Sequence, residues 1–163
     1  MAQNKGKQFE QRLRKDWLNS IEDTIIYRLN DQMSGFKGST NIGDFIGYKY
    51  PLIFIIDAKT KKGNTIGFSD IRQYDKMLEY KDIKGVFTGV ICWFYERDKV
   101  VWIPIQTLYK LKQDDKKSYN IKMLDSNEYP AFEIPSKKLR TFMDTDYNKF
   151  VEYCKGEFDA STD

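Results

Sequence analysis

Residues 52–56 constrain the fold most, because they place five apolar side chains in succession on one short segment. Alternate residues of a β-strand point to opposite faces, so a strand that is apolar at every position must be covered on both sides. Such a strand belongs in the middle of a sheet. The apolar run ends at Asp57 and Lys59. Since these two residues are two positions apart, they project from the same face of the strand.

A second strand is predicted just before this run, over residues 44–48, with a turn at 49–51. The two strands would form an antiparallel hairpin. If the turn is centred between Tyr50 and Pro51, then Asp44 lies directly opposite Asp57. Directly opposed residues have Cβ atoms about 5 Å apart. The pattern therefore predicts two carboxylates side by side at one end of the hairpin.

The remaining pattern alternates between helices and strands. Phe9, Leu13 and Trp17 recur at helical spacing and predict an amphipathic helix over residues 4–20. This order of elements predicts an α/β fold, a mixed central β-sheet flanked by helices. A length of 163 residues favours one domain, 1–163, with a core at about 4–105 and a C-terminal extension at 106–163. We further expect strands at 24–29, 86–95, 99–105 and 119–123, and helices at 69–80, 106–111 and 144–155.

The composition excludes several kinds of chemistry. The chain contains no histidine, which rules out Ser-His-Asp and Cys-His triads and histidine-ligated zinc. Cys92 and Cys154 are too isolated in the sequence to form a disulfide framework or a thiolate metal site, which favours a reducing compartment. No apolar run is long enough to span a bilayer and the first residues are polar, so we expect a cytoplasmic protein without a membrane partner.

Charge is distributed unevenly. The chain has 27 Lys and Arg against 24 Asp and Glu, but from Asp144 onward there are six acids and two lysines. Residues 1–143 therefore carry 25 bases against 18 acids, a net charge of +7. The bases gather at 5–15, 59–62 and 137–140. Clusters of this size suit a phosphate backbone, although solvated lysine runs at a protein surface are the alternative on charge alone.

The predicted carboxylate pair has two interpretations. Two like charges about 5 Å apart repel each other unless a cation joins them. Oxygen ligands select hard ions, so Asp44 and Asp57 predict a Mg²⁺ site at which Mn²⁺ substitutes. The alternative is that Asp57 and Lys59 form an ordinary ion pair at a strand end.

These residues also resemble a known family. Asp44, Asp57 and Lys59, with Glu10 on the preceding helix and Gln73 on the following one, resemble the PD-(D/E)xK nuclease superfamily. More narrowly, residues 43–60, GDFIGYKYPLIFIIDAKT, resemble the core of RecU-type Holliday junction resolvases in the interval between the two acids and in the glycine three positions after the first. The resemblance covers residues 3–105 and implies a restriction-endonuclease-like core.

The resemblance implies a role for each matched residue. Asp44 and Asp57 would be metal ligands, together with the backbone carbonyl of Ala58, and Glu10 would complete the acidic site directly or through water. In the family the second acid is usually glutamate, so Asp57 shortens that ligand by one methylene group.

Lys59 and Gln73 would act beside the metal rather than bind it. Lys59 would orient or activate the attacking water and stabilise the charge that develops on the phosphate, while Gln73 would brace the site from behind. The segment before Asp44, a projecting stalk in the family, is here only residues 30–43. The expected DNA contacts are Lys5, Lys7, Arg12, Phe36, Lys37, Lys61 and Lys62.

The function implied is a Mg²⁺-dependent, structure-specific endonuclease that resolves four-way DNA junctions in recombination, repair or phage genome processing. Two opposed cuts in a junction require two sites, so we expect a homodimer acting on four-way and branched DNA in the cytoplasm, which is the host cytoplasm for a phage protein. Two alternatives stay open. One is a nuclease of the same superfamily that acts on other DNA structures, and the other is a non-catalytic DNA-binding module of the same fold.

Overall fold

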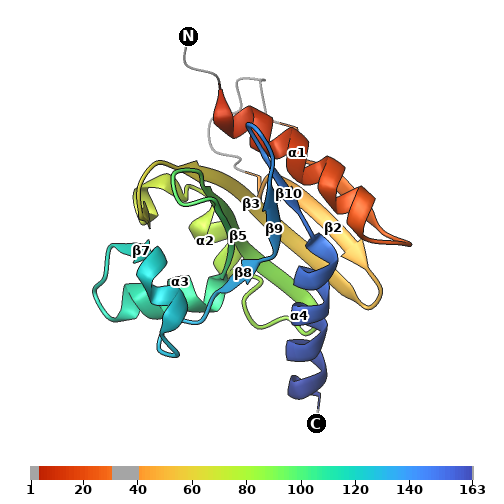
Figure 1. Ribbon diagram of the computed structural model, residues 1–163. Helices are drawn as coiled ribbons and strands as arrows, with labels where there is room; N and C mark the ends of the chain where they lie inside the picture. Colours follow the sequence, from red (N-terminus) through yellow and green to blue (C-terminus); the bar gives the residue numbers. More distant parts are fainter. Residues whose placement is uncertain (1–3, 31–40, 163) are drawn as a thin grey trace.

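The computed structural model describes residues 4–30 and 41–162. These residues form a central six-stranded sheet with helices on both sides (Figure 1), which agrees with the predicted fold class. In their order across the sheet the strands are β1 (Ile25–Arg28), β2 (Phe45–Lys49), β3 (Leu52–Lys61), β5 (Val86–Phe94), β6 (Lys99–Pro104) and β8 (Phe132–Ile134). The helices are α1 (Lys5–Ser20), α2 (Tyr74–Leu78), α3 (Ile105–Gln113) and α4 (Tyr147–Ser161).

The apolar strand β3 lies inside the sheet, as its sequence predicts. It pairs antiparallel with β2 and parallel with β5, so the sheet is mixed. Phe54 and Ile56 point into the core on one face, and Ile55 on the other face is only 4% exposed. Ile53, near the start of the strand, is 42% exposed. Burial on both faces therefore begins at Phe54, two residues later than the apolar run suggests.

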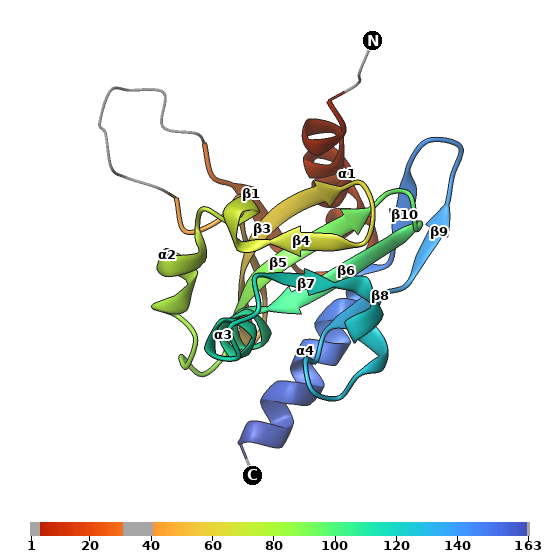
Figure 2. The ribbon, with the colours of Figure 1, turned by 90° about the vertical axis from the view of Figure 1, so that its left-hand side faces the viewer.

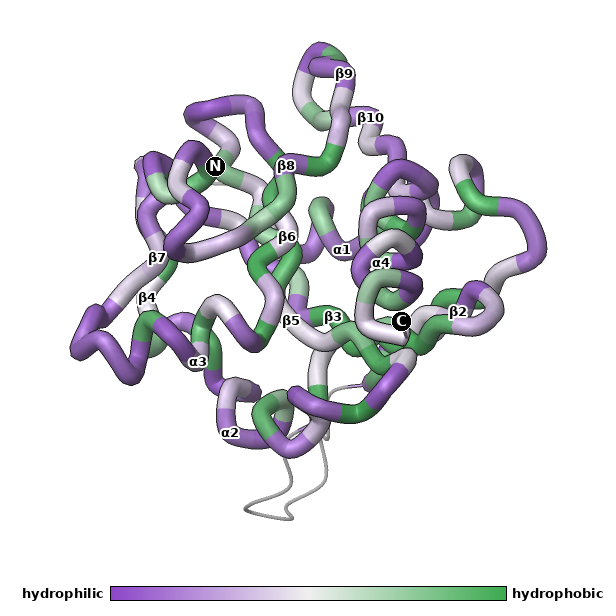
Figure 3. Tube along the Cα trace, turned by 90° about the horizontal axis from the view of Figure 1, so that it is seen from below, coloured by the Kyte–Doolittle hydropathy of each residue, from purple (hydrophilic) through white to green (hydrophobic). Residues whose placement is uncertain are grey.

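The two faces of the sheet carry separate hydrophobic cores. α1 and α4 pack on one face, through residues such as Trp17 and Phe150. α2 and α3 pack on the other, through residues such as Met77 and Leu108. Figure 2 shows α2 and α3 in front of the sheet, and Figure 3 shows the hydrophobic residues concentrated along the central strands. Since α4 shares a core with α1, the end of the chain packs against its beginning.

Helix α1 is anchored at its start and along one stripe. The Asn4 side chain accepts a hydrogen bond from the Lys7 amide and caps the first turn. Phe9, Leu13 and Trp17 form the buried stripe that their spacing predicts. Trp17 packs directly on β2, where a Cβ on Gly47 would come within 2.9 Å of the indole ring. A glycine at this position is therefore needed for the helix to approach the sheet so closely.

The predicted helix over residues 69–80 is wrong in its extent. The chain instead forms a 3-10 turn, η1 (Phe68–Asp70), and then the five-residue α2. The Asp70 carboxylate accepts hydrogen bonds from the Gly67 amide and from Lys61, which holds the turn against the end of β3. A short strand, β4 (Thr65–Gly67), precedes this turn. It pairs with β7 (Ser118–Asn120) in a small separate sheet.

The C-terminal third also departs from its predicted pattern. The expected strand at 119–123 becomes β7 followed by a 3-10 helix, η2 (Ile121–Asp125), because the Asn120 side chain caps that turn. The expected helix at 144–155 instead starts at Tyr147, where the Asp146 carboxylate accepts from the amides of the first turn. The preceding residues form a hairpin of β9 (Ser136–Lys138) and β10 (Met143–Thr145). No helix among the described residues is long and apolar enough to cross a membrane.

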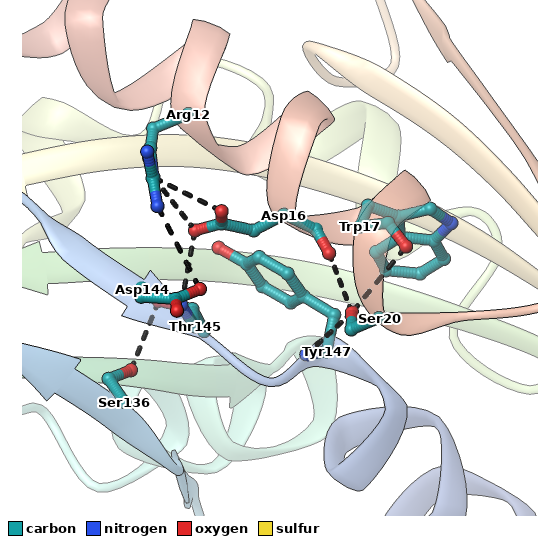
Figure 4. A network of polar contacts seen from close by, with 8 residues as sticks. All are labelled: Arg12, Asp16, Trp17, Ser20, Ser136, Asp144, Thr145 and Tyr147. Carbon is teal, nitrogen blue, oxygen red and sulfur yellow. Dashed lines mark hydrogen bonds and ion pairs between the residues drawn. The ribbon is translucent and has the colours of Figure 1, made fainter.

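A buried polar network joins this hairpin and α4 to α1 (Figure 4). Asp16 is 2% exposed, and its carboxylate accepts from the Thr145 amide at 3.1 Å and pairs with Arg12 Nε at the same distance. One turn later, the Ser20 hydroxyl donates to the Asp16 carbonyl and accepts from the Tyr147 amide. Burial raises the pKa of Asp16, while Thr145 and Arg12 partly offset this effect. The network thus joins residues far apart in the sequence.

Removing the carboxylate of Asp16 should destabilise the fold. In Asp16→Ala, the Thr145 amide and the Arg12 guanidinium lose their acceptor, so we expect the free energy of unfolding to fall by about 3 kcal/mol. Urea denaturation measures this loss. The matched control is Glu22→Ala, an exposed acid just after the same helix, which should change stability by less than about 0.5 kcal/mol. Equal stabilities for the two variants would contradict the structural role of Asp16.

Candidate active site

The β2–β3 hairpin brings the two predicted carboxylates together. The ladder pairs Phe45 with Ile56, and it continues through a 2.8 Å hydrogen bond from the Asp44 amide to the Ile56 carbonyl. The ladder has the predicted register but ends at Phe45, and Asp44 lies beside Asp57, whose pKa it raises. Asp44 is also fixed through its side chain, since its Oδ2 accepts from the Ala58 amide at 2.8 Å. The prediction that these two acids are neighbours is therefore confirmed.

Glycine just before Asp44 permits this close approach. A Cβ on Gly43 would come within 2.9 Å of the Ile56 carbonyl oxygen, which is backbone and has no freedom to move aside. The chain can therefore enter β2 only with a glycine here. This steric requirement explains why glycine is present at position 43, directly before Asp44.

Asp57 lies in an unusual environment. Its side chain is fully buried, and neither carboxylate oxygen has a hydrogen-bond donor among the described residues. The nearest cation is Lys59, with Nζ 3.5 Å from Oδ1. Burial, followed by the neighbouring Asp44, raises the pKa of Asp57 well above its ordinary value, and Lys59 only partly offsets this. A simple strand-end ion pair at the surface does not describe this residue.

These observations fit a divalent cation bound through oxygen. Two adjacent carboxylates, one of them buried without donors, lack the positive charge that would make their burial favourable. Within the described parts of the chain, no group of three or more acidic, cysteine or histidine side chains is arranged to hold a metal. The protein ligands would then be Asp44, Asp57 and the Ala58 carbonyl, with water completing the shell. Mg²⁺ or Mn²⁺ at this position stays a prediction.

Glu10 is held close to the site by a residue that sequence reasoning missed. Its carboxylate accepts from Arg28 of β1, at 2.9 Å from Nε and 2.7 Å from the terminal nitrogen. This pair links α1 to the edge of the sheet. The only sequence signal for Arg28 is that it ends a β-branched strand with a charge. Whether Glu10 contacts a metal directly or through water stays a prediction.

A pocket of about 740 Å³ lies between α1 and the adjoining strands. Its lining includes the backbone or side chains of Lys7, Glu10, Arg14, Arg28, Ala58 and Lys59. Four of these six residues are bases. Lys59 is a quarter exposed, so its ammonium group reaches solvent while it remains close to Asp57. The pocket can therefore admit an anionic group beside Lys59 and Glu10, whereas Asp44 and Asp57 do not line it.

Gln73 lies immediately before α2, at its N-cap position rather than inside a helix. Its side-chain oxygen is buried and has no hydrogen-bond donor among the described residues. It does not line the pocket that contains Lys59. The proposed supporting role of Gln73 at the site therefore stays a prediction.

The five expected DNA-binding residues that the structure describes separate into three groups. Lys7 and Lys62 are exposed at the end of the molecule where β3 ends, and Lys7 lines the pocket. Lys61 and Arg12 instead serve the fold, paired with Asp70 and with Asp16. Lys5 lies over the rings of Trp93 and Tyr95, outside the pocket. Phe36 and Lys37 lie outside the described residues.

Asp70 is an acid near the site that sequence reasoning did not single out. It pairs with Lys61 at 3.0 Å, one strand alternation beyond Lys59. Partial burial opposes its ionisation, but the hydrogen bonds from Lys61 and from the Gly67 amide outweigh burial and lower the pKa of Asp70. The charge of Asp70 is therefore compensated by two hydrogen bonds, which the carboxylate of Asp57 lacks.

Comparison with known proteins supports the fold. No protein-family model and no curated protein matches the chain. Among solved structures, the chain is similar to Hjc, a Holliday junction resolvase from the archaeal hyperthermophile Archaeoglobus fulgidus, with a TM-score of 0.54 and 18% sequence identity. The match covers 78% of this chain and 95% of that chain. The chain thus has the restriction-endonuclease-like fold of Hjc, which agrees with the predicted fold class.

Binding of a divalent cation can be tested without DNA. We expect Mn²⁺ at 100 times its dissociation constant to raise the free energy of unfolding of the wild-type protein by about 2.7 kcal/mol, by mass action. Asp57→Asn should lose most of this effect, and Asp70→Asn, which removes an acid paired with Lys61, should keep it. Thermal denaturation with and without Mn²⁺ gives the measurement. An undiminished Mn²⁺ effect in Asp57→Asn would show that the ion binds elsewhere.

Proposed function

We propose that this protein is a metal-dependent DNA endonuclease that resolves four-way junctions. The observation that carries the proposal is the carboxylate pair of Asp44 and buried Asp57, with Lys59 beside it, on a fold shared with a Holliday junction resolvase. Phosphodiester hydrolysis at neutral pH needs an activated water and positive charge near the phosphate. The chain offers carboxylates for a cation and a lysine for the phosphate, and it needs no histidine.

Each residue of the site has a definite task in this proposal. Asp44 and Asp57, with the Ala58 carbonyl, would hold Mg²⁺, which supplies a water of lowered pKa and neutralises negative charge when bound. Lys59 places its ammonium group at the edge of the pocket, where it would contact the scissile phosphate or the attacking water. Glu10 is kept in place by Arg28, so its carboxylate can hold a water on the α1 side.

The finer classification within the superfamily rests on sequence. Residues 43–60 resemble the core of RecU-type resolvases, whereas the structural similarity is to Hjc. Both are Holliday junction resolvases, so they favour the same substrate. A nuclease acting on other branched or linear DNA, and a non-catalytic DNA-binding module, are the competing functions. Retention of Asp44, Asp57 and Lys59 in one cluster favours catalysis over binding alone.

Substrate assays discriminate these functions. Labelled four-way junction, flap and linear duplex, each with Mg²⁺ and with EDTA, should show cleavage of the junction that depends on Mg²⁺. Lys59→Ala should lower the single-turnover rate by on the order of 10² to 10³ while junction binding is retained, since one stabilising charge is lost from the transition state. Lys76→Ala, an exposed lysine on α2, is the control and should cleave normally. A nearly unchanged rate in Lys59→Ala would exclude the proposed role.

We also propose that the protein acts as a homodimer, because a two-fold symmetric junction needs two opposed cuts. The structure offers a surface for a second copy, an exposed apolar row across the edge of the sheet. Ile25 of β1 pairs with Tyr48 of β2, which pairs with Ile53 of β3, and these side chains are 62%, 40% and 42% exposed. The row lies on the same sheet face as Asp57, since Ile53 and Asp57 are an even number of residues apart. Two copies packed through it would therefore have their carboxylate pairs on the facing sides of the sheets.

The proposed dimer predicts a concentration-dependent assembly. Sedimentation equilibrium should give twice the chain mass for the wild-type protein, and Ile25→Asp with Ile53→Asp should shift it to the monomer, because buried charges oppose association. Ile83→Asp, a similarly exposed isoleucine elsewhere, serves as control and should leave the dimer intact. A wild-type monomer at all accessible concentrations would contradict the proposal.

A further inference from the structure

The hairpin of β9 and β10, residues 136–145, is a basic element that the candidate active site does not use. We call it the basic hairpin. Its first half contains Lys137, Lys138 and Arg140. In Figures 1 and 2 it projects beyond the sheet next to the start of α1, at the opposite end of the molecule from the C-terminus. The carboxyl ends of β3 and β5 reach the same end of the fold.

Strand alternation gives the two lysines of the hairpin different surroundings. Lys137 pairs across the hairpin with Asp144, so an acid lies beside it. Lys138 pairs with Met143, whose side chain is buried, so Lys138 lies on the side of the hairpin that faces the body of the protein. Arg140 follows in the turn and is exposed, with no acidic partner among the described residues. Arg140 therefore has the least compensated positive charge of the hairpin, and Lys138 is directed toward the body of the protein.

A hollow of about 260 Å³ separates this side of the hairpin from the body. Its lining contains three bases, Lys5, Lys138 and Arg140, but a single acid, Asp98. Asp98 pairs with Lys138 at 3.0 Å, but the two side chains are 40% and 63% exposed, so water screens the pair and it holds the lysine only weakly. Tyr95 also lines the hollow, and Lys5 lies over its ring at 4.9 Å. The hollow is thus a positively charged surface with aromatic side chains in it.

The hollow and the candidate active site lie on two sides of the first turn of α1. Lys5 lines the hollow, whereas Lys7 and Glu10 on the same helix line the pocket that contains Lys59. The pocket and the hollow are also adjacent across the sheet. Trp93 lines the hollow, and its partner on the neighbouring strand, Thr60, lines the pocket. An extended anion that occupies the pocket can therefore continue around this turn of α1 into the hollow.

We propose that the basic hairpin and its hollow bind the sugar–phosphate backbone of a DNA arm that leads away from the candidate active site. The proposal rests on the nuclease function proposed above, and it adds a second binding surface to that function. Phosphates match this surface better than a protein partner does, because three bases stand against one acid and two of the bases, Lys138 and Arg140, are exposed to water. Backbone contacts carry no sequence information, so the hairpin would add affinity for any arm.

Salt-dependent binding tests the proposal directly. Anisotropy of a labelled four-way junction in EDTA is measured at several salt concentrations for the wild-type protein and for Lys138→Gln with Arg140→Gln. Each phosphate contact contributes about 0.9 to the log–log slope, so loss of two contacts should lower the slope by about 1.8 and weaken binding by up to about 60-fold at 0.1 M salt. Single-turnover cleavage at saturating protein should stay at the wild-type rate.

Two matched controls separate a local contact from a general effect of charge. Lys84→Gln with Lys155→Gln removes the same charge near the C-terminal end of the molecule, where Lys84 lies over the ring of Phe158. These substitutions should change binding only slightly. Asp98→Asn breaks the same ion pair with Lys138 but removes an acid, so it should bind the junction at least as tightly as the wild-type protein.

Each result points in one direction. Equal losses in the hairpin and control variants, or no loss in either, would overturn the hairpin as a DNA contact while leaving the nuclease proposal intact. A selective loss in a protein that binds but does not cleave any DNA would support the hairpin and overturn the nuclease. A wild-type protein that fails to bind junctions would overturn both.

Discussion

The antiparallel pairing of β2 with β3 is the constraint on which the candidate site depends. It holds Asp44 next to Asp57 through the hydrogen bond from the Asp44 amide to the Ile56 carbonyl, and side-chain repulsion alone does not break this bond. A slip of one residue would turn every side chain of β2 to the other face, which would expose Phe45 and bury Tyr48. The hydrophobic core therefore enforces the register, and the register in turn enforces the proximity of two acids. Burial of apolar side chains elsewhere in the sheet therefore compensates for the repulsion between the Asp44 and Asp57 carboxylates.

The burial of Asp57 follows from its position in the middle of the sheet. β5 lies along one side of β3 and β2 along the other, and Val90 directly beside Asp57 is itself fully buried. A carboxylate in such a place needs a partner that the protein chain supplies only in part, through Lys59 at 3.5 Å. Asp70 shows the contrast, because a hydrogen-bonded lysine and a backbone amide keep its charge favourable. A bound cation would give Asp57 the equivalent compensation.

The sequence predicts those parts of the structure that depend on local periodicity. The strand β3, the stripe of Phe9, Leu13 and Trp17, and the hairpin register all follow from spacing over fewer than twenty residues. Five strands have only three residues, too few to show a period, and four of them, β4, β8, β9 and β10, are set by tertiary contacts without a signal in the sequence.

Long-range pairs were equally invisible in the sequence. Glu10 forms an ion pair with Arg28, and Asp16 accepts a hydrogen bond from the Thr145 amide, because the fold brings distant segments together. No sequence spacing indicates such partners. Arg12 could therefore not be distinguished, from the sequence, from bases that are available to bind DNA. The candidate site residues could be predicted from the sequence. It could not be predicted which basic side chains are left unpaired and available to bind a ligand.

The structure also explains why the small net charge of the chain is misleading. Lys5, Lys7, Lys59 and Arg140 line the two adjoining hollows beside the start of α1, whereas in the last turns of α4 Lys155 stands with Glu157 and Asp159. This local excess of bases, separated from the mixed charges of α4, attracts a polyanion although the net charge of the chain is small. Asp16 and its partners make this separation possible, since they hold the hairpin and the start of α4 against α1 and leave the basic turn of the hairpin outside the network. The same buried interactions that close the fold therefore determine which of its basic side chains face outward beside the candidate active site.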